Sequence, residues 1–263
     1  MSLAVIGPTI ILEVEDSDSL IDFYEDAYSS PGSEWTVYAD WRTLSSVGKA
    51  EHVIELCRRV GLQPQSTLDV GCGDGALMEE LHARGFGGRL VGMEISGAAA
   101  RIAAARPAVD DVGTFDGVTL GLPDGSFDLG VLSHVLEHTT DPPALLAEVA
   151  RVCRAVVFEV PLEANRSARR PAKRAHAQEI GHLHRLDRAA ARRIALDAGL
   201  RPAAELADPL GLEVQRFFAD TPALRAKATA KWAVRSGAHR AAPGLAERLF
   251  TVHYACLCLP ADA

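Results

Sequence analysis

Three glycines spaced two residues apart, Gly71, Gly73 and Gly75, follow an apolar run that ends at Val70. Glycine lets the backbone turn sharply and lets a ligand approach where a side chain would clash. A helix that begins after this turn directs unpaired N–H groups at a ligand carboxylate. Asp69 stands just before the glycines, where a buried carboxylate would repel a pyrophosphate but bind an ammonium group. The G-x-G-x-G spacing therefore disfavours the dinucleotide pattern G-x-G-x-x-G.

Two acidic residues follow at positions that suit the sugar and the base of a nucleoside. Glu94 ends the run Leu90–Glu94, and an acidic residue at the tip of a second strand accepts hydrogen bonds from ribose hydroxyls. Asp116, with Gly117 after it, is expected at the tip of the third strand. There its carboxylate can accept a hydrogen bond from an exocyclic adenine amine. Glu94 stands in register with the glycine turn, and this register makes it more specific than an acidic residue after a strand is by itself.

Histidines gather near the same expected edge. His134 follows an expected strand, and His182 and His184 lie in the stretch Gly181–Asp187. Histidine titrates near neutrality and suits proton transfer. Each of the three is a candidate general base, and for each a packed, hydrogen-bonded role is the alternative. His138 is expected to be structural, because it falls in the first turn of the helical region that follows.

The segments that must position these residues alternate between strand and helix from about residue 48. Helical spacing of apolar residues predicts helices, and short β-branched or apolar runs predict strands. The alternation implies an α/β fold, a doubly wound, mainly parallel sheet with helices on both faces. Such sheets bind ligands beyond the carboxyl ends of their strands. The expected helices are 50–60, 76–83, 97–105, 143–153 and 187–198, and the expected strands are 66–70, 89–95, 127–133, 155–160 and 252–259.

The ordered motifs resemble the class I S-adenosylmethionine-dependent methyltransferases, especially those acting on small molecules, such as ubiquinone-pathway and antibiotic methyltransferases. The motifs are the Asp69–Gly75 turn, Glu94, Asp116, Leu122–Asp128 and His134–His138. The resemblance covers roughly residues 67–200 and implies a Rossmann-like sheet of seven strands with an antiparallel last strand. It implies S-adenosylmethionine as cofactor. Gly71, Cys72 and Gly73 would contact its methionine part, Asp69 would lie near its amino group, and Ser133 would line it through the backbone. Glu94 would hold the ribose, Ile95 would pack against the adenine, and Asp116 and Gly117 would lie at the adenine amine.

Two segments fall outside the alternation and are candidates for lids. The expected organisation is an N-terminal lid or extension, residues 1–47, and a methyltransferase domain, residues 48–263, with an insertion at about 215–250. In the first segment, Tyr24 and Tyr28 are predicted either to touch the cofactor as the lid closes or to pack in the core.

The resemblance implies methyl transfer to an oxygen or nitrogen of a small molecule, and the Ala- and Arg-rich composition favours bacterial specialised metabolism. The protein must align the acceptor, exclude water and remove a proton from a hydroxyl acceptor, because the sulfonium is already activated. Two alternatives stay open: an RNA or protein methyltransferase, and a regulatory protein that binds the cofactor without turnover. The basic stretch 166–193 is either a solvated face or a loop that attracts an anionic substrate.

Composition narrows the class further. The 263 residues, 48% hydrophobic and 24% charged, suit one domain with an added subdomain. The formal net charge of −8 makes nucleic acid an unexpected partner. Five scattered cysteines predict reduced thiols in the cytoplasm and no metal site. Neither a secretory signal nor a membrane span is expected, and the oligomeric state is not indicated.

Overall fold

A seven-stranded sheet forms the centre of the computed structural model, which describes residues 17–29 and 33–261. The strand order is β3-β2-β1-β4-β5-β7-β6, and β7 runs antiparallel to both of its neighbours. This confirms the predicted doubly wound sheet with a reversed last strand. The segment inspected for a secretory signal, residues 1–14, lies outside the described residues. The strands are β1 (Ser66–Val70), β2 (Arg89–Glu94), β3 (Asp111–Thr114), β4 (Phe127–Ser133), β5 (Cys153–Pro161), β6 (Leu200–Asp208) and β7 (His253–Pro260).

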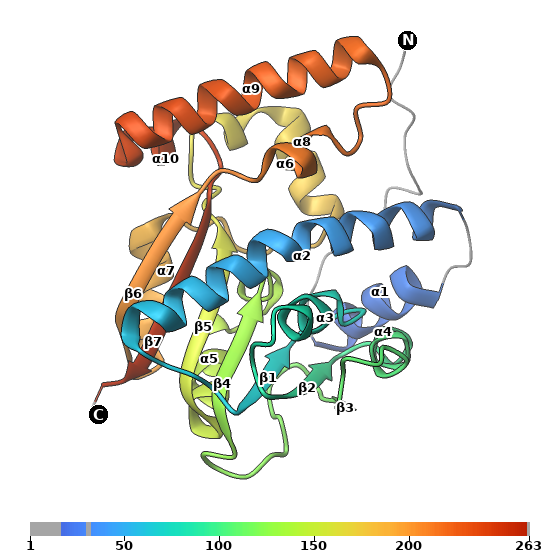
Figure 1. Ribbon diagram of the computed structural model, residues 1–263, viewed down its shortest axis with the longest axis vertical. Helices are drawn as coiled ribbons and strands as arrows, with labels where there is room; N and C mark the ends of the chain where they lie inside the picture. The colour runs from blue at the N-terminus through green and yellow to red at the C-terminus, as the bar shows by residue number, and fades with distance from the viewer. Residues whose placement is uncertain (1–16, 30–32, 262–263) are drawn as a thin grey trace.

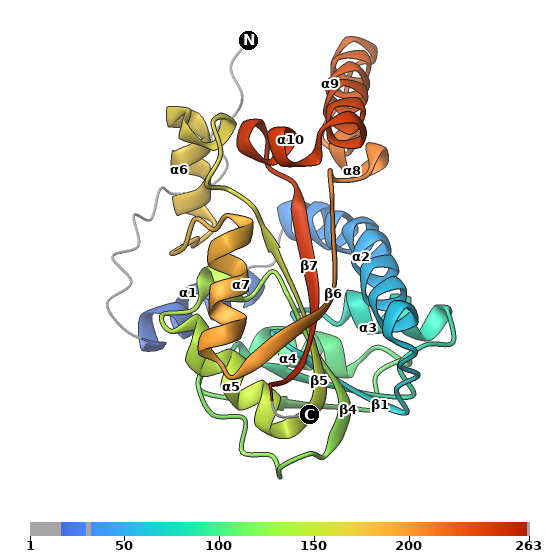
Figure 2. The ribbon, with the colours of Figure 1, turned by 90° about the vertical axis from the view of Figure 1, so that its left-hand side faces the viewer.

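Helices cover both faces of the sheet, and each face has its own apolar core. Helices α2 and α3 pack on one face and α5 and α7 on the other, as Figure 2 shows on its right and left sides. Burying one apolar stripe of each helix against an apolar strand face is what holds this layered fold together. The helices are α1 (Ser17–Ser29), α2 (Ser33–Val60), α3 (Ala76–Ala83), α4 (Gly97–Ala104), α5 (Pro142–Val152) and α7 (Arg188–Asp197).

The remaining helices gather beyond the carboxyl ends of the parallel strands. Figures 1 and 2 both show α6, α8, α9 and α10 above this edge of the sheet. No helix in the described part of the chain is long and apolar enough to cross a membrane. The elements at this edge are η1 (Leu136–His138), η2 (Ser167–Arg169), α6 (Pro171–Glu179), α8 (Leu212–Arg216), α9 (Pro222–Ala241) and α10 (Pro243–Leu249).

Helix α2 and strand β6 depart from the sequence-based expectation. Helix α2 begins at Ser33 and not near residue 50, so it crosses the expected boundary between residues 47 and 48. Strand β6 was not predicted, because Ala and Glu have low β-propensity and its Pro202 argues against a central strand. The structure accommodates Pro202 because β6 is an edge strand with a register shift between Pro202 and Ala204.

Candidate functional site

The loop between β1 and α3 carries the three predicted glycines, with φ of 72° at Gly71, 56° at Gly73 and 79° at Gly75. A Cβ added to Gly71 would lie 2.5 Å from Val135 Cγ2, and one added to Gly73 would lie 2.8 Å from the Tyr28 hydroxyl. Only glycine fits such positive-φ positions at so close an approach. The loop therefore presents bare backbone to whatever binds at the carboxyl end of β1.

Glu94 lies at the tip of β2 and is 5% exposed. Its Oε2 accepts a hydrogen bond from Gly73 N at 2.7 Å, and its Oε1 accepts from Ile95 N at 2.8 Å and Ser96 N at 3.2 Å. Burial raises the pKa of Glu94, although these backbone bonds oppose the shift. A carboxylate offers about four lone-pair sites, so Glu94 keeps acceptor capacity for ligand hydroxyls.

Asp69, at the end of β1, is a buried carboxylate without its full set of partners. It is 1% exposed, and its Oδ2 has no hydrogen-bond partner among the described residues. Burial raises its pKa to about 7, against the opposing charge of Lys49. Ser133 Oγ, at the tip of β4, is likewise buried and unpartnered in the described part of the chain. Such orphaned polar atoms fit a ligand that supplies donors, as the ammonium end of S-adenosylmethionine does.

Asp116 follows β3 at the far end of the same edge. Its Oδ1 accepts hydrogen bonds from Val118 N at 2.8 Å and Thr119 N at 2.7 Å, and these bonds lower its pKa. The carboxylate is therefore ionised and exposed, with its second oxygen outside this turn. Gly117 has φ of 86°, and a Cβ added there would lie 3.8 Å from Ile95 Cγ2. These residues form the end of the site that suits a flat base.

Helix α1 brings Tyr24 and Tyr28 to the glycine loop between β1 and α3, called the cofactor loop below. The Tyr28 hydroxyl lies against Gly73, and the Tyr24 ring packs edge-on against His138 with centroids 5.9 Å apart. Burial raises the pKa of both phenols, which keeps them neutral. Glu25 accepts hydrogen bonds from Ser96 Oγ at 2.8 Å and Ala98 N at 3.0 Å, which fixes α1 to the N-terminus of α4.

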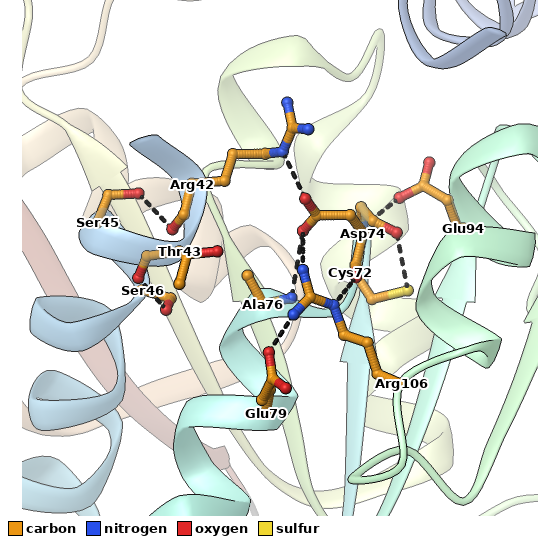
Figure 3. A network of polar contacts seen from close by, with 11 residues as sticks. Arg42, Thr43, Ser45, Ser46, Cys72, Asp74, Ala76, Glu79, Glu94 and Arg106 are labelled. Carbon is orange, nitrogen blue, oxygen red and sulfur yellow. Dashed lines mark hydrogen bonds and ion pairs between the residues drawn. The ribbon is translucent and has the colours of Figure 1, made fainter. Parts of the chain in front are cut away.

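Asp74 holds the cofactor loop in place through hydrogen bonds and ion pairs with two arginines (Figure 3). The sequence did not predict this network. Asp74 Oδ2 accepts a hydrogen bond from Arg42 Nε at 2.8 Å, and Arg106 Nε donates to the Asp74 carbonyl. Asp74 is 2% exposed, so the two guanidinium groups compensate a buried charge. Arg42 belongs to α2 and Arg106 follows α4. The network thus joins both helices to the glycine turn.

A cluster of histidines and carboxylates lies beside the loop and is called the histidine wall below. Its members are His52, His134, Glu137, Glu159, Asp208 and His253. His134 Nδ1 lies 2.9 Å from Glu137 Oε1, and His134 Nε2 lies 3.0 Å from His253 Nδ1. Glu159 Oε2 lies 2.9 Å from His52 Nδ1. Burial opposes protonation of His52, but the hydrogen bonds that it donates to Asp208 and Glu159 outweigh this effect and raise its pKa to about 10. Of this wall, only His134 was predicted from the sequence.

The other two candidate bases, His182 and His184, lie in different surroundings. His182 lines the cavity, and its Nδ1 lies 2.8 Å from Glu163 Oε2. His184 does not line the cavity, and its Nε2 lies 2.8 Å from the Thr139 carbonyl. The geometry therefore does not bring His184 together with His134 and His182. His138 lines the cavity with its Nδ1 3.1 Å from the Gly181 carbonyl, and burial lowers its pKa to about 4.

One cavity of about 1420 Å³ joins these parts. It runs from the cofactor loop past the histidine wall to α6, α8 and α9. A single drug-sized ligand needs roughly 300–1,000 Å³, so this cavity has room for a cofactor and an acceptor side by side. Of the predicted site residues, it is lined by Tyr24, Tyr28, Asp69, Gly71, Cys72, Gly73, Glu94, Ile95, Asp116, Gly117, Ser133, His134 and His182.

Known proteins share this architecture. A family model described as a methyltransferase domain matches residues 45–205. Nocamycin O-methyltransferase of Saccharothrix syringae is 39% identical over 93 residues, which cover 33% of this chain and 33% of that protein. The chain thus matches about a third of that relative's length.

Two solved structures show the same fold. Geranyl diphosphate C-methyltransferase from Streptomyces coelicolor A3(2), in complex with Mg²⁺, geranyl diphosphate and S-adenosyl-L-homocysteine, has a TM-score of 0.61 and 18% identity, covering 92% of this chain and 97% of that chain. Phosphoethanolamine N-methyltransferase 2 of Haemonchus contortus, in complex with S-adenosyl-L-methionine, has a TM-score of 0.59 and 13% identity, covering 90% and 60%. The chain belongs to the methyltransferase domain family and has the fold of the class I S-adenosylmethionine-dependent methyltransferases.

Proposed function

We propose that this methyltransferase transfers the methyl group to an oxygen or nitrogen of a small molecule, in bacterial specialised metabolism. The observation that carries the proposal is the single cavity that continues beyond the cofactor residues to the wall around His134 and on to α9. A hydroxyl acceptor bound there lies beside ionisable side chains, in surroundings that suit the loss of its proton. The similarity to nocamycin O-methyltransferase over 93 residues supports a role in making a specialised metabolite.

The acceptor carries a negatively charged group. Lys173 of α6 and Arg235 of α9 line the acceptor end of the cavity, and Arg170 and Lys231 stand close to them. Burial, and then the charges of Arg235, Lys173 and Arg170, lower the pKa of Lys231. In the part of the chain that the structure describes, none of these four side chains forms an ion pair with a carboxylate. Such an uncompensated cationic cluster favours a carboxylate or phosphate ligand.

The alternatives have less support. The basic stretch that an RNA or protein substrate would use is partly neutralised. Arg188 pairs with Glu247 at 2.5 Å, and Arg192 pairs with Glu205. A regulatory protein without turnover would not require an acceptor chamber beside the cofactor.

The test is release of S-adenosylhomocysteine with a panel of hydroxyl- and amine-bearing acceptors, each in neutral, carboxylated and phosphorylated form. We expect turnover with a charged member. Lys173→Ala and Arg235→Ala should raise KM roughly 10-fold or more for that acceptor, since a charge-assisted hydrogen bond contributes about 1.5–3 kcal/mol. Arg240→Ala, on α9 outside the cavity lining, is the matched control. Equal turnover of the neutral and charged members would refute the anionic acceptor.

A further inference from the structure

Three side chains from three strands meet at the carboxyl edge of the sheet: His134 after β4, Glu159 in β5 and His253 in β7. His134 Nε2 lies 3.0 Å from His253 Nδ1, and Glu159 Oε1 lies 3.4 Å from the first and 3.3 Å from the second. Ligand atoms bound to a metal at 2.0–2.2 Å are roughly 2.9–3.5 Å apart at octahedral or tetrahedral angles. The triangle therefore has the dimensions of three ligands on one metal ion.

Partners behind the triangle hold its atoms in place. Glu137 Oε1 lies 2.9 Å from His134 Nδ1. When His134 donates its Nδ1–H to Glu137, its Nε2 presents a lone pair to the triangle. His52 Nδ1 holds the other oxygen of Glu159 at 2.9 Å, and Asp208 Oδ1 lies 3.2 Å from His52 Nε2. A carboxylate behind a metal-binding imidazole is the usual arrangement in metal sites.

The backbone at His134 is a second, independent observation. His134 has φ of 60° and is the one residue other than glycine with positive φ in the described ranges 17–29 and 33–261. Its N–H donates to the Glu159 carbonyl at 2.9 Å. Sparsely populated backbone conformations concentrate at functional sites, where surrounding structure enforces them. Here the turn delivers the imidazole of His134 to Glu159 and His253.

The three candidate ligands can be reached from the cavity, and carboxylates surround them. His134, Glu159 and His253 all line the cavity. Glu137, Glu159 and Asp208 bring three carboxylates to this wall, and Lys49 and His52 are the cations that lie beside its two ligand imidazoles. Glu137 is fully buried and Glu159 is 3% exposed, so an added cation offsets carboxylate charge that water does not solvate.

We propose that His134, Glu159 and His253 bind one divalent transition-metal ion with open positions facing the acceptor. Two imidazoles and one carboxylate suit Zn²⁺, Fe²⁺, Co²⁺ or Mn²⁺, whereas Mg²⁺ prefers oxygen ligands. This departs from the sequence-based expectation of a metal-free protein, because the three ligands lie far apart in the sequence.

The ion's role rests on the proposed function: it binds the acceptor oxygen as a Lewis acid and lowers the pKa of the hydroxyl. The hydroxyl proton leaves to solvent, the methyl C–S bond breaks, the C–O bond forms, and S-adenosylhomocysteine departs. The proposal therefore assigns His134 to metal binding rather than to proton transfer.

A second group of potential ligands, Glu137, His138 and His182, lies nearby. It is the weaker candidate because Glu137 is fully buried and does not line the cavity, whereas all three members of the triangle do.

The experiment titrates the chelator-treated full chain with Zn²⁺ alone by calorimetry, without acceptor. Wild type should bind one equivalent. Glu159→Gln and His253→Gln should abolish this binding, and Glu137→Gln should weaken it by roughly 10–100-fold, as loss of a partner behind a ligand does. His184→Gln, a histidine outside the cavity, is the matched control and should bind as wild type.

Two further measurements keep the proposal falsifiable. S-adenosylhomocysteine affinity and the unfolding midpoint show whether each variant folds, and the Co²⁺ absorption spectrum of wild type reports nitrogen and oxygen ligation without any variant. Absence of Zn²⁺ binding to wild type, or binding that Glu159→Gln leaves intact and His182→Gln removes, would overturn the site. Turnover by a metal-free enzyme would overturn the metal's role and leave the methyltransferase proposal standing.

Discussion

Glu94, which we predict to bind the ribose of the cofactor, is already held in place by the backbone around it. It already accepts backbone hydrogen bonds from Gly73, Ile95 and Ser96, so the free protein stores an aligned, nearly buried acceptor. An acceptor oriented before binding costs the ligand little ordering entropy. The glycine loop and Glu94 thus form one prepared surface, in which each positions the other.

Replacing Glu94 by Gln tests this surface. The amide keeps the shape but removes the charge and one acceptor, so S-adenosylhomocysteine binding should weaken by about 1.5–3 kcal/mol if the ribose bonds are charge-assisted. Isothermal calorimetry measures the loss. Glu179→Gln, an exposed change on α6, should leave the affinity unchanged. An unaltered affinity in Glu94→Gln, with an unaltered unfolding midpoint, would remove Glu94 from the cofactor site.

Residue types and spacing were enough to predict one half of the site. The glycine turn, Asp69, Glu94 and Asp116 lie within one α/β stretch with a fixed strand–turn–helix pattern, so local sequence places them together. Glu159, His253, His52 and Asp208 come from four elements that only the sheet order brings side by side. No local pattern distinguishes them from ordinary strand and helix residues, and this is why the wall around His134 was missed.

At the scale of elements, α1 and α2 connect the N-terminal segment to the cofactor loop. Glu25 ties α1 to α4, Tyr28 packs against Gly73, and Arg42 of α2 pairs with Asp74. The helix expected over 187–198 is α7, and Asp187 is its N-cap, since its Oδ1 accepts a hydrogen bond from Ala190 N at 2.8 Å. The start of α2 and strand β6 were not predictable, because tertiary packing decides them rather than periodicity.

We predict that α1 closes further over the cofactor. Its amides should exchange hydrogen more slowly when S-adenosylhomocysteine binds, because Tyr24 and Tyr28 line the cavity that the ligand fills. Hydrogen exchange with mass spectrometry reads this directly. Helix α7, none of whose residues line the cavity, serves as the internal reference. Equal protection of α1 with and without ligand would refute the lid role of this helix.

For the whole molecule, the two apolar cores stabilise the fold, whereas polar side chains buried at the carboxyl edge of the sheet destabilise it. Asp69 is 1% exposed, and burial raises its pKa. Glu137 and Glu159 are equally buried, but the histidines beside them outweigh the effect of burial and lower the pKa of both carboxyls. Burying charge without full compensation costs stability, which functional sites tolerate because the rest of the fold offsets it. Much of that cost is relieved only when ligands arrive, so the stability of this protein is coupled to occupation of its cavity.

Asp69 makes this coupling measurable as a pH dependence. Its folded-state pKa of about 7 lies above the ordinary aspartate pKa of 3.8. A raised carboxyl pKa means that the folded state holds the proton more tightly than the unfolded state. The contribution of Asp69 to stability is therefore present below about pH 4 and is lost as pH rises towards 7, with an upper bound of about 4 kcal/mol. Asp69→Asn should remove this slope, and urea unfolding of both proteins at pH 5 and pH 8 isolates it.

The affinity for S-adenosylhomocysteine should depend on pH in the opposite direction, because the ligand's ammonium pairs with ionised Asp69. S-adenosylhomocysteine affinity should fall by up to about tenfold per pH unit below 7 in wild type and stay level in Asp69→Asn. Parallel pH profiles of affinity in the two proteins would show that Asp69 does not bind the ammonium end of the cofactor.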